Sequence, residues 1–166
     1  MSRDEVLTHM RYMAQATHLP VNADFESGYA DTPEGVAESV HMAVGTGVAG
    51  ISIEDSTGDP REPLRELAEA TERMCAAREA IDATGGETLL IGRAENFFVD
   101  RPDLDDTLAR LKAYADAGAD CLYAPGLRTR ERVHITEGLR PGEQVIVAGL
   151  QDLRDGTRVN LLETAQ

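Results

Sequence analysis

The chain has 166 residues and a formal net charge of −14, with 30 acidic side chains against 16 from lysine and arginine. That charge argues against nucleic acid or an anionic membrane surface as a partner. Neither a signal peptide nor an apolar run long enough to span a membrane is evident. Cys75 and Cys121 lack the spacing of a metal site, and we expect both to be buried free thiols in a cytoplasmic protein.

Strand-like and helix-like segments alternate along residues 1–130. A helix is expected over residues 2–17, where Ser2 and Glu5 can form a capping box. Another is expected to begin at Thr32 and Pro33, an N-cap followed by a proline at the first helical position. The other predicted helices lie within 64–84 and 103–117, and the predicted strands are 20–25, 50–55, 88–96 and 120–124.

The spacing of these strands predicts a fold class. Each strand start lies about one βα unit after the previous one, and amphipathic helices separate the apolar strands. This alternation implies a parallel sheet covered by helices. We therefore expect an α/β fold, a partial (β/α)8 barrel of the TIM type with about four βα units and a short β-rich C-terminal tail. A closed eight-unit barrel needs roughly 200 residues or more.

The sequence changes character after residue 130. Residues 133–136, 144–148 and 157–161 alternate like strands, and turn signals separate them without a helical pattern. We therefore predict two parts: a barrel-like domain over residues 1–130, and an antiparallel or loosely attached β-rich tail of different origin over residues 131–166.

Acidic residues gather where the predicted strands end. Asp24 and Glu26 close the first strand, and Glu54 and Asp55 close the second. Parallel α/β folds place their chemistry at these carboxyl ends. The i, i+2 spacing would put Asp24 and Glu26 on one face, where they repel unless a cation, a proton or an arginine lies between them. The pattern favours a metal site, and a solvated, helix-capping acidic loop is the alternative.

Three motifs follow one another at these strand ends: Val21-Asn22-Ala23-Asp24-Phe25-Glu26-Ser27-Gly28-Tyr29, Gly50-Ile51-Ser52-Ile53-Glu54-Asp55 and Ile91-Gly92-Arg93-Ala94-Glu95-Asn96. Together they resemble the isocitrate lyase/phosphoenolpyruvate mutase family, and the resemblance covers Ser2 to about Thr129. It implies a (β/α)8 barrel, usually oligomeric, that uses Mg²⁺ to make or break C–C or C–P bonds beside a 2-oxo acid. The expected enzyme is a Mg²⁺-dependent lyase or phosphonomutase that acts on small 2-oxo or 2-hydroxy carboxylates through an enolate, and the expected assembly is a homo-oligomer.

The same resemblance implies roles for single residues. By this resemblance, Asp24 matches the residue that binds the metal directly. Glu26 and Glu54 match the acids that hold the metal's water molecules. Mg²⁺ prefers oxygen ligands and keeps several waters, which agrees with such a set. Arg93 resembles the arginine that binds the substrate carboxylate through bidentate hydrogen bonds. The alternative is that Arg93 forms an ion pair with neighbouring acids. The implied substrate-binding set is Asn22, Arg93 and Glu95.

The resemblance breaks at the loop after the second acidic strand. Lyases of the family often carry Lys-Lys-Cys-Gly-His there, with the cysteine as acid/base, whereas this chain has Ser56-Thr57-Gly58-Asp59-Pro60. Asp59 is then the remaining candidate catalytic acid or base in that loop, beside Arg93. The opening units of the barrel pattern and its last two units have no counterpart, so we expect the chain to be a poor catalyst on its own.

The tail resembles a different class of protein. Residues 138–151 and 153–156 are similar to the membrane-proximal β-domain of the periplasmic adaptor (membrane fusion) proteins of efflux pumps. Three hypotheses stay open: a Mg²⁺-dependent enzyme completed by partner chains, a non-catalytic barrel fragment or assembly module, and, least favoured, an efflux adaptor fragment. Magnesium-dependent turnover of 2-oxo or 2-hydroxy dicarboxylates would separate the first from the second.

Overall fold

The computed structural model describes residues 1–127 and the backbone of residues 144–146. Helices and strands alternate along the described chain as expected. None of its helices is both long and apolar enough to cross a membrane. The elements are α1 (Arg3–Ala16), β1 (Asn22–Asp24), α2 (Pro33–Val44), β2 (Gly50–Glu54), α3 (Leu67–Ala83), β3 (Leu89–Arg93), α4 (Leu104–Asp116), β4 (Cys121–Tyr123) and β5 (Gln144–Ile146).

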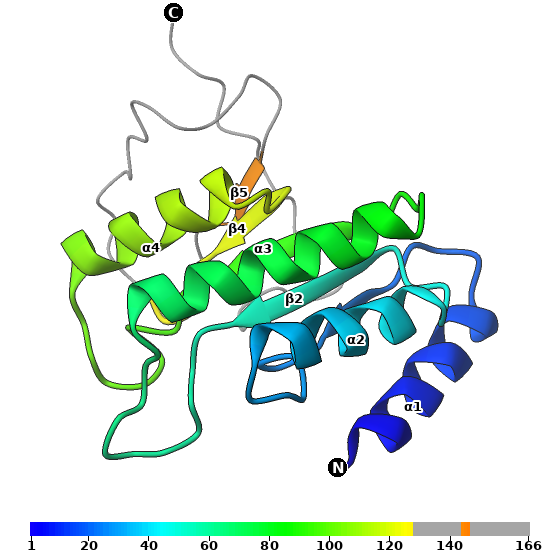
Figure 1. Cartoon of the computed structure of the whole chain (residues 1–166), viewed down its shortest axis with the longest axis horizontal. Coiled ribbons are helices and arrows are strands. Elements are labelled where there is room, and N and C mark those ends of the chain that lie inside the picture. The colour runs from blue at the N-terminus through cyan, green and yellow to red at the C-terminus, as the bar shows by residue number, and fades with distance from the viewer. Residues whose placement is uncertain (128–143, 147–166) are drawn as a thin grey trace, which may run out of the picture.

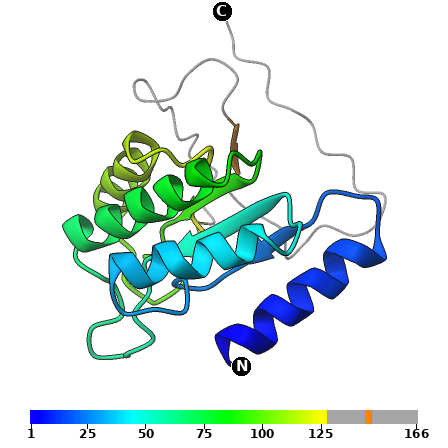
Figure 2. The same cartoon turned by 45° about the vertical axis from the view of Figure 1, so that its right-hand side comes forward.

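The strands form one sheet in the order β1-β2-β3-β4-β5, and every neighbouring pair is parallel. Figures 1 and 2 show α2, α3 and α4 side by side over one face of this sheet, with α1 packed beside α2. Strands in chain order, with a helix after each of β1, β2 and β3, are the arrangement of successive units in a (β/α) barrel. The α/β class and the parallel order of the four predicted strands are confirmed.

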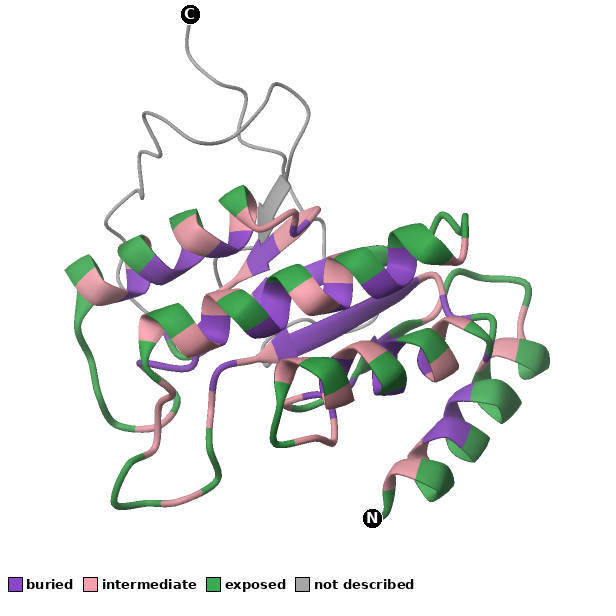
Figure 3. Ribbon diagram, viewed as in Figure 1, coloured by how far each residue is buried: buried purple, intermediate pink, exposed green. Residues whose placement is uncertain are grey.

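The core lies between the sheet and these helices. In Figure 3, β2 is buried for most of its length, and the helices turn their buried stripes toward the sheet. Alternate residues of a strand point to opposite faces, so Ile51 and Ile53 both point under the helices. The fully inaccessible apolar side chains are Phe25, Val36, Val40, Ala43, Ile51, Ala77, Ile81, Leu90, Ala94 and Tyr114.

Local signals begin the helices where the sequence predicts. Ser2 and Glu5 form the capping box of α1, Thr32 caps α2 before Pro33, and the Asp103 carboxylate caps α4. A side-chain acceptor at the N-cap satisfies a backbone N–H group that the helix leaves unpaired. These starts are therefore decided by residues within one turn of each helix.

One glycine allows α4 to lie directly on the sheet. A Cβ added to Gly92 of β3 would lie 2.8 Å from Cβ of Tyr114. No real side chain tolerates that separation, so the missing side chain makes room for the aromatic ring of α4. Tyr114 thereby reaches the helix-facing side of the strand that carries Arg93.

Two sequence predictions need correction here. The described part of the tail, β5, pairs in parallel with β4 rather than antiparallel. The intervening residues 124–143 exceed the dozen or so that a parallel crossover needs, so alternation alone could not decide the direction. The rest of the tail lies outside the described residues, and the domain boundary at 130/131 stays a prediction.

The cysteines also differ from expectation. Cys75 is exposed and Cys121 is half-buried. The buried stripe of α3 runs through Ala70, Met74 and Ala77. Cys75 follows Met74 by one residue, which is about 100° around the helix, so it leaves that stripe.

Candidate functional site at the carboxyl ends of the strands

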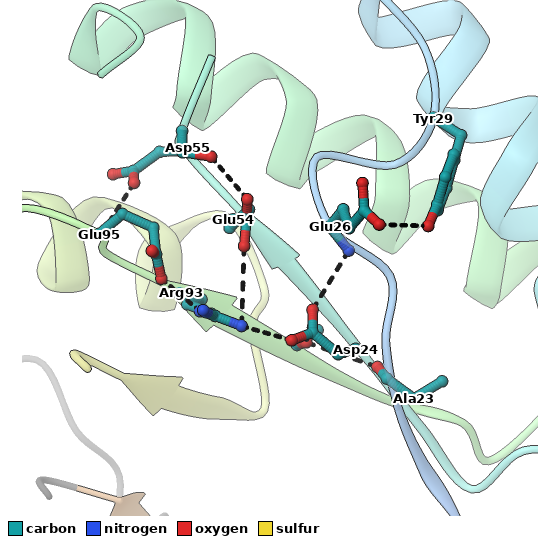
Figure 4. A network of polar contacts seen from close by, with 10 residues as sticks. Ala23, Asp24, Glu26, Tyr29, Glu54, Asp55, Arg93 and Glu95 are labelled. Atoms are coloured by element: carbon teal, nitrogen blue, oxygen red, sulfur yellow. Dashed lines mark hydrogen bonds and ion pairs between the residues drawn. The ribbon is translucent and has the colours of Figure 1, made fainter. Parts of the chain in front are cut away.

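Three predicted site residues close three neighbouring strands. Asp24 ends β1, Glu54 ends β2 and Arg93 ends β3. Asp24 is opposite Ser52 and Glu54 is opposite Arg93 in the register of the sheet. Since residues two apart in a strand share a face, all three side chains lie on the face opposite Ile51 and Ile53. Figure 4 shows them meeting at that edge.

Arg93 joins the acids of this cluster. Its Nη1 lies 2.6 Å from Oδ2 of Asp24 and 3.6 Å from Oε2 of Glu54, and its Nε donates to the Glu95 carboxylate. The side chains of Arg93, Glu54 and Glu95 are 13%, 16% and 1% exposed, whereas that of Asp24 is 62% exposed. The cluster therefore has a buried side, formed by Glu95 and Arg93, and an exposed side at Asp24.

The environment of Arg93 keeps its charge. Burial acts to lower the pKa of Arg93, but the bond to Glu95 and the charges of Glu95, Asp24 and Glu54 raise it overall. The rings of Phe98 and Tyr123 lie 5.9 and 5.6 Å from its Cζ, within range of a cation–π contact. Arg93 is thus a permanently charged, oriented donor at the strand ends.

The pKa of Glu54 is shifted by its surroundings in the cluster. Burial raises its pKa, and the charges of Asp24 and Glu26 act in the same direction. Its bond from Ser56, 2.6 Å long, and the charge of Arg93 oppose the shift. The cluster therefore has more carboxylates than one arginine neutralises, which favours the approach of a further cation.

Glu26 does not share a face with Asp24, contrary to prediction. The strand ends at Asp24, and Glu26 has a left-handed backbone with φ of 48°. Its N–H donates to Oδ1 of Asp24 at 3.3 Å, while its carboxylate accepts from the Tyr29 hydroxyl at 2.6 Å. The turn directs the side chain toward Tyr29, as Figure 4 shows. The i, i+2 rule fails because it applies only while the strand continues.

Arg73 of α3 holds this turn, and the sequence analysis did not single it out. The residue is 1% exposed. Its guanidinium donates to the carbonyl oxygens of Ser27, Ala30 and Asp31 at 2.6, 2.7 and 3.0 Å. An arginine on the otherwise apolar stripe of α3 was the available signal, because a buried cation needs acceptors nearby.

The remaining predicted residues occupy other places. Asn22 lies on the Asp24 face, one pleat deeper, opposite Gly50. Glu95 lies behind Arg93 and orients it, so its carboxylate is not exposed for direct contact with a ligand. Asp59 binds Arg61 through its carboxylate at 2.6 and 3.1 Å, and this bond lowers its pKa. The structure does not bring Asp59 to the cluster, and a lowered pKa weakens a carboxylate as a base.

A cavity in the described chain lies apart from the cluster. It has a volume of about 810 Å³ and lies between the β2–α3 and β3–α4 loops, where Arg65, Asn96 and Arg110 line it. Asp24, Glu54 and Arg93 are not among its lining residues. The strand-end cluster is thus separate from this cavity, and it is exposed to solvent on the side of Asp24.

The donor chemistry of the cluster can be compared with what magnesium requires. Within the described residues, no three His, Cys, Asp or Glu side chains converge closely enough to hold a metal ion together. Oxygen donors in excess of positive charge nevertheless suit a hard cation that keeps most of its water. The Asp24 side chain is 62% exposed to solvent, and that of Glu54 is 16% exposed. The residues fit such a water-rich Mg²⁺ site.

The chain is similar to known proteins over most of its length. The family model described as phosphoenolpyruvate phosphomutase matches residues 1–160. The chain is 33% identical over 135 residues to an oxaloacetate decarboxylase of Rhodopseudomonas palustris (strain BisA53), covering 78% of this chain and 45% of that protein. It is 31% identical over 124 residues to the 2-methylisocitrate lyase of Escherichia coli (strain K12), covering 72% and 41%. The chain thus spans less than half the length of these relatives.

A solved structure agrees in fold. A lyase/mutase candidate from Burkholderia cenocepacia J2315 superposes with a TM-score of 0.75 and 45% sequence identity, covering 78% of this chain and 46% of that one. The match to the family model continues past residue 130, and the tail's resemblance to efflux adaptor proteins finds no support in these comparisons. The chain therefore belongs to the phosphoenolpyruvate phosphomutase family, within the group that also includes the isocitrate lyases.

Proposed function

We propose that this chain carries the carboxylate- and magnesium-binding edge of a lyase that cleaves a C–C bond in a small 2-oxo or 2-hydroxy carboxylate. The observation that carries the proposal is the position of Arg93, held by Glu95 and placed between Asp24 and Glu54 at three adjacent strand ends. The decarboxylase and lyase among the relatives act on substrates of this class by name. Cleavage or formation of a C–P bond, as in the phosphomutases, is the alternative reaction to be tested together with C–C cleavage.

The cluster offers complementary binding groups for a carboxylate. Arg93 has a planar guanidinium that can donate two parallel hydrogen bonds, and the neighbouring acids raise its pKa, so it stays charged in the physiological pH range. Nη1 contacts the exposed Asp24, so a ligand carboxylate can compete there from the solvent side. Nε stays bound to the buried Glu95, which keeps the guanidinium plane fixed during that exchange. Binding of a carboxylate thus requires no rearrangement of the buried Arg93–Glu95 pair.

Cleavage of a C–C bond beside a carbonyl leaves an electron pair on carbon, which resonance places on the carbonyl oxygen as an enolate. Mg²⁺, when bound, would supply the positive charge that stabilises this oxygen. Asp24 would hold the ion and Glu54 its water, whereas Glu26 is turned to Tyr29 and contributes charge rather than a ligand. Arg93 would bind the substrate carboxylate, and Asn22 would contact the substrate deeper on the same face.

The loop after β2 offers Asp59 as the candidate general acid or base. The loop after β2 contains no cysteine, histidine or lysine, and Asp59 is engaged by Arg61. We therefore propose slow turnover by the 166-residue chain. A non-catalytic barrel module that retains only ligand binding is the second candidate, favoured by the pairing of Asp59 with Arg61. We further propose a homo-oligomeric, cytoplasmic protein.

A binding experiment with oxalate tests the proposal without requiring turnover. Oxalate is a planar dicarboxylate that resembles the enolate of a 2-oxo acid. We expect calorimetry to detect oxalate binding in the presence of Mg²⁺ and much weaker binding after chelation. Asp24→Asn should weaken this binding, and Asp59→Asn is the matched control, since it removes an acid outside the cluster. Absence of any Mg²⁺-dependent oxalate binding by the wild-type chain would contradict the proposal, and equal loss in the control would deny the cluster its role.

Turnover then separates the two candidates. The substrates to compare are oxaloacetate, 2-methylisocitrate and phosphonopyruvate, each with and without Mg²⁺. Magnesium-dependent product formation that Arg93→Met abolishes would establish the enzyme. Oxalate binding without turnover of any of the three would favour the binding module.

A further inference from the structure

We propose that Asp55 is the positioning residue of the strand-end cluster, which sets the separation between Glu54 and the Arg93–Glu95 pair. The inference rests on the proposed function only in taking Arg93 and Glu54 as the ligand-facing groups. Asp55 follows Glu54 directly but points to the other face of the sheet, where it is 2% exposed. It therefore acts on the site through its neighbours and without touching a ligand.

The carboxylate of Asp55 joins two strand ends and one helix. Its Oδ1 accepts from the backbone N–H of Glu95 at 2.9 Å, while its Oδ2 accepts from Nη1 of Arg110 at 3.1 Å and from the Tyr114 hydroxyl at 2.5 Å. Figure 4 shows the first of these contacts, between the labelled Asp55 and Glu95. Regular pairing of β2 and β3 ends at Glu54 and Arg93, so the bond to Glu95 is the next link between the two chain segments.

This link acts where the ladder can no longer do so. Beyond a strand end the backbone has no regular partner, and its direction depends on side-chain bonds. Asp55 holds the first such bond of the β3–α4 segment, and that segment carries the Glu95 carboxylate to Nε of Arg93. Because Glu54 is covalently joined to Asp55, one side chain connects the acid of β2 with the arginine of β3.

The carboxylate is itself held firmly. Arg110 donates from the same guanidinium to the Arg65 carbonyl oxygen at 2.9 Å and to Oδ2 of Asp106 at 2.7 Å. Burial, followed by the charge and bond of Asp55, raises the pKa of Tyr114, so its hydroxyl remains a donor. The Asp55 backbone oxygen also accepts from the N–H of Arg65 at 2.9 Å. A group with its charge paired and its oxygens occupied is a rigid reference point for the strand end.

The two oxygens of Asp55 have separable duties. Oδ1 serves the site side through Glu95, and Oδ2 serves the helix side through Arg110 and Tyr114. Removal of the whole carboxylate should affect both, whereas loss of one helix-side donor should affect stability alone. Tyr114→Phe is therefore a matched control inside the same network, because it leaves the contact of Oδ1 with Glu95 in place.

The test measures the order of Arg93 directly. Hydrogen exchange of the Arg93 Nε–H, followed by NMR, reports its bond to Glu95 in the wild-type chain and in three variants: Asp55→Ala, Asp55→Asn and Tyr114→Phe. We expect Asp55→Ala to accelerate this exchange by about tenfold and to weaken Mg²⁺-dependent oxalate binding by about tenfold, the scale of one net hydrogen bond. Asp55→Asn should change both in the same direction by less, since its single oxygen cannot serve both sides.

Tyr114→Phe should lower the melting temperature and leave Arg93 exchange and oxalate affinity within about twofold of wild type, because it spares the Glu95 contact. All measurements are made at equal intervals below each variant's melting temperature. If Asp55→Ala does not fold, Asp55→Asn decides. The proposal would be overturned if the Asp55 variants showed the same Arg93 Nε–H exchange rate and the same oxalate affinity as Tyr114→Phe. A wild-type chain that binds no oxalate would defeat the proposed function, while the exchange comparison would still decide the role of Asp55.

Discussion

Arg93 at the end of β3 lies 2.6 Å from the Asp24 carboxylate at the end of β1, although β2 runs between these two strands. The two residues are 69 positions apart in the chain. The guanidinium therefore spans the width of three strand ends and brings Glu54, which closes β2, into the same cluster at 3.6 Å. This one side chain joins the acidic ends of β1 and β2 to the end of β3 in a single site.

Replacement of Arg93 should cost both stability and binding. Arg93→Met leaves the buried Glu95 without its partner, and breaking such a pair costs about 3 kcal/mol of unfolding free energy. Denaturant unfolding at pH 7.5 would measure this loss. The double variant Arg93→Met, Glu95→Gln should recover a large part of it, because the uncompensated charge is gone. Equal stability of the single and double variants would show that the pair is not coupled.

Asp24 should be required for the response to magnesium. A ligand that binds only the folded chain stabilises it by about 2.7 kcal/mol at a hundred times its Kd. Asp24→Asn removes the exposed carboxylate, so we expect the Mg²⁺-dependent rise in melting temperature to disappear. Asp59→Asn, which alters an acid paired with Arg61, should keep the full rise. A wild-type chain that shows no shift at millimolar Mg²⁺ would leave the cluster as an acidic loop held by arginine.

Glu95 should make stability depend on pH near neutrality. Burial raises its pKa to about 7, above the ordinary value of 4.5, although the bond and charge of Arg93 act in the opposite direction. The folded chain then holds this proton more tightly than the unfolded chain does. Its contribution to stability is complete below pH 4.5 and is lost as the pH rises through 7. Glu54 has a raised pKa and contributes with the same sign.

Glu95→Gln tests this pH dependence. The variant cannot ionise, so its unfolding free energy should fall less than that of wild type between pH 5 and pH 8, by about 1.4 kcal/mol for each unit of pKa difference removed. Urea unfolding at both pH values measures the difference. Parallel pH profiles for the variant and wild type would show that Glu95 is charged throughout this range.

Arg73 should control the turn that carries Glu26. Glu26 and Tyr29 have left-handed backbones, with φ of 48° and 52°. Arg73→Met leaves three carbonyl oxygens of this turn without their donor. We expect a loss of about 2 to 3 kcal/mol and faster amide exchange at Gly28, whose N–H donates to Phe25 at 2.9 Å. Arg78→Met removes a less buried arginine and should not change Gly28 exchange. Unchanged exchange in Arg73→Met would contradict the role of the clamp.

Local sequence determined the elements of this protein. Capping residues, apolar periodicity and glycine or proline breaks act within a turn or two, so the starts of α1, α2 and α4 and the parallel order of β1 to β4 could be predicted from them. The convergence of Asp24, Glu54 and Arg93 followed from the rule that parallel strands end at one edge. The direction of β5 did not follow, because alternation of apolar residues does not encode strand direction.

Tertiary structure alone decided how the site is built. Glu26 turns away because its backbone becomes left-handed after Asp24, and Arg73, from a helix more than forty residues later, holds that turn. Asp55 looked like another acid at a strand end, yet it faces α4, where Tyr114 fits over Gly92. These outcomes depend on which distant groups can pair a buried charge or fill a gap. Such pairing is a property of the packed chain, and no local pattern records it.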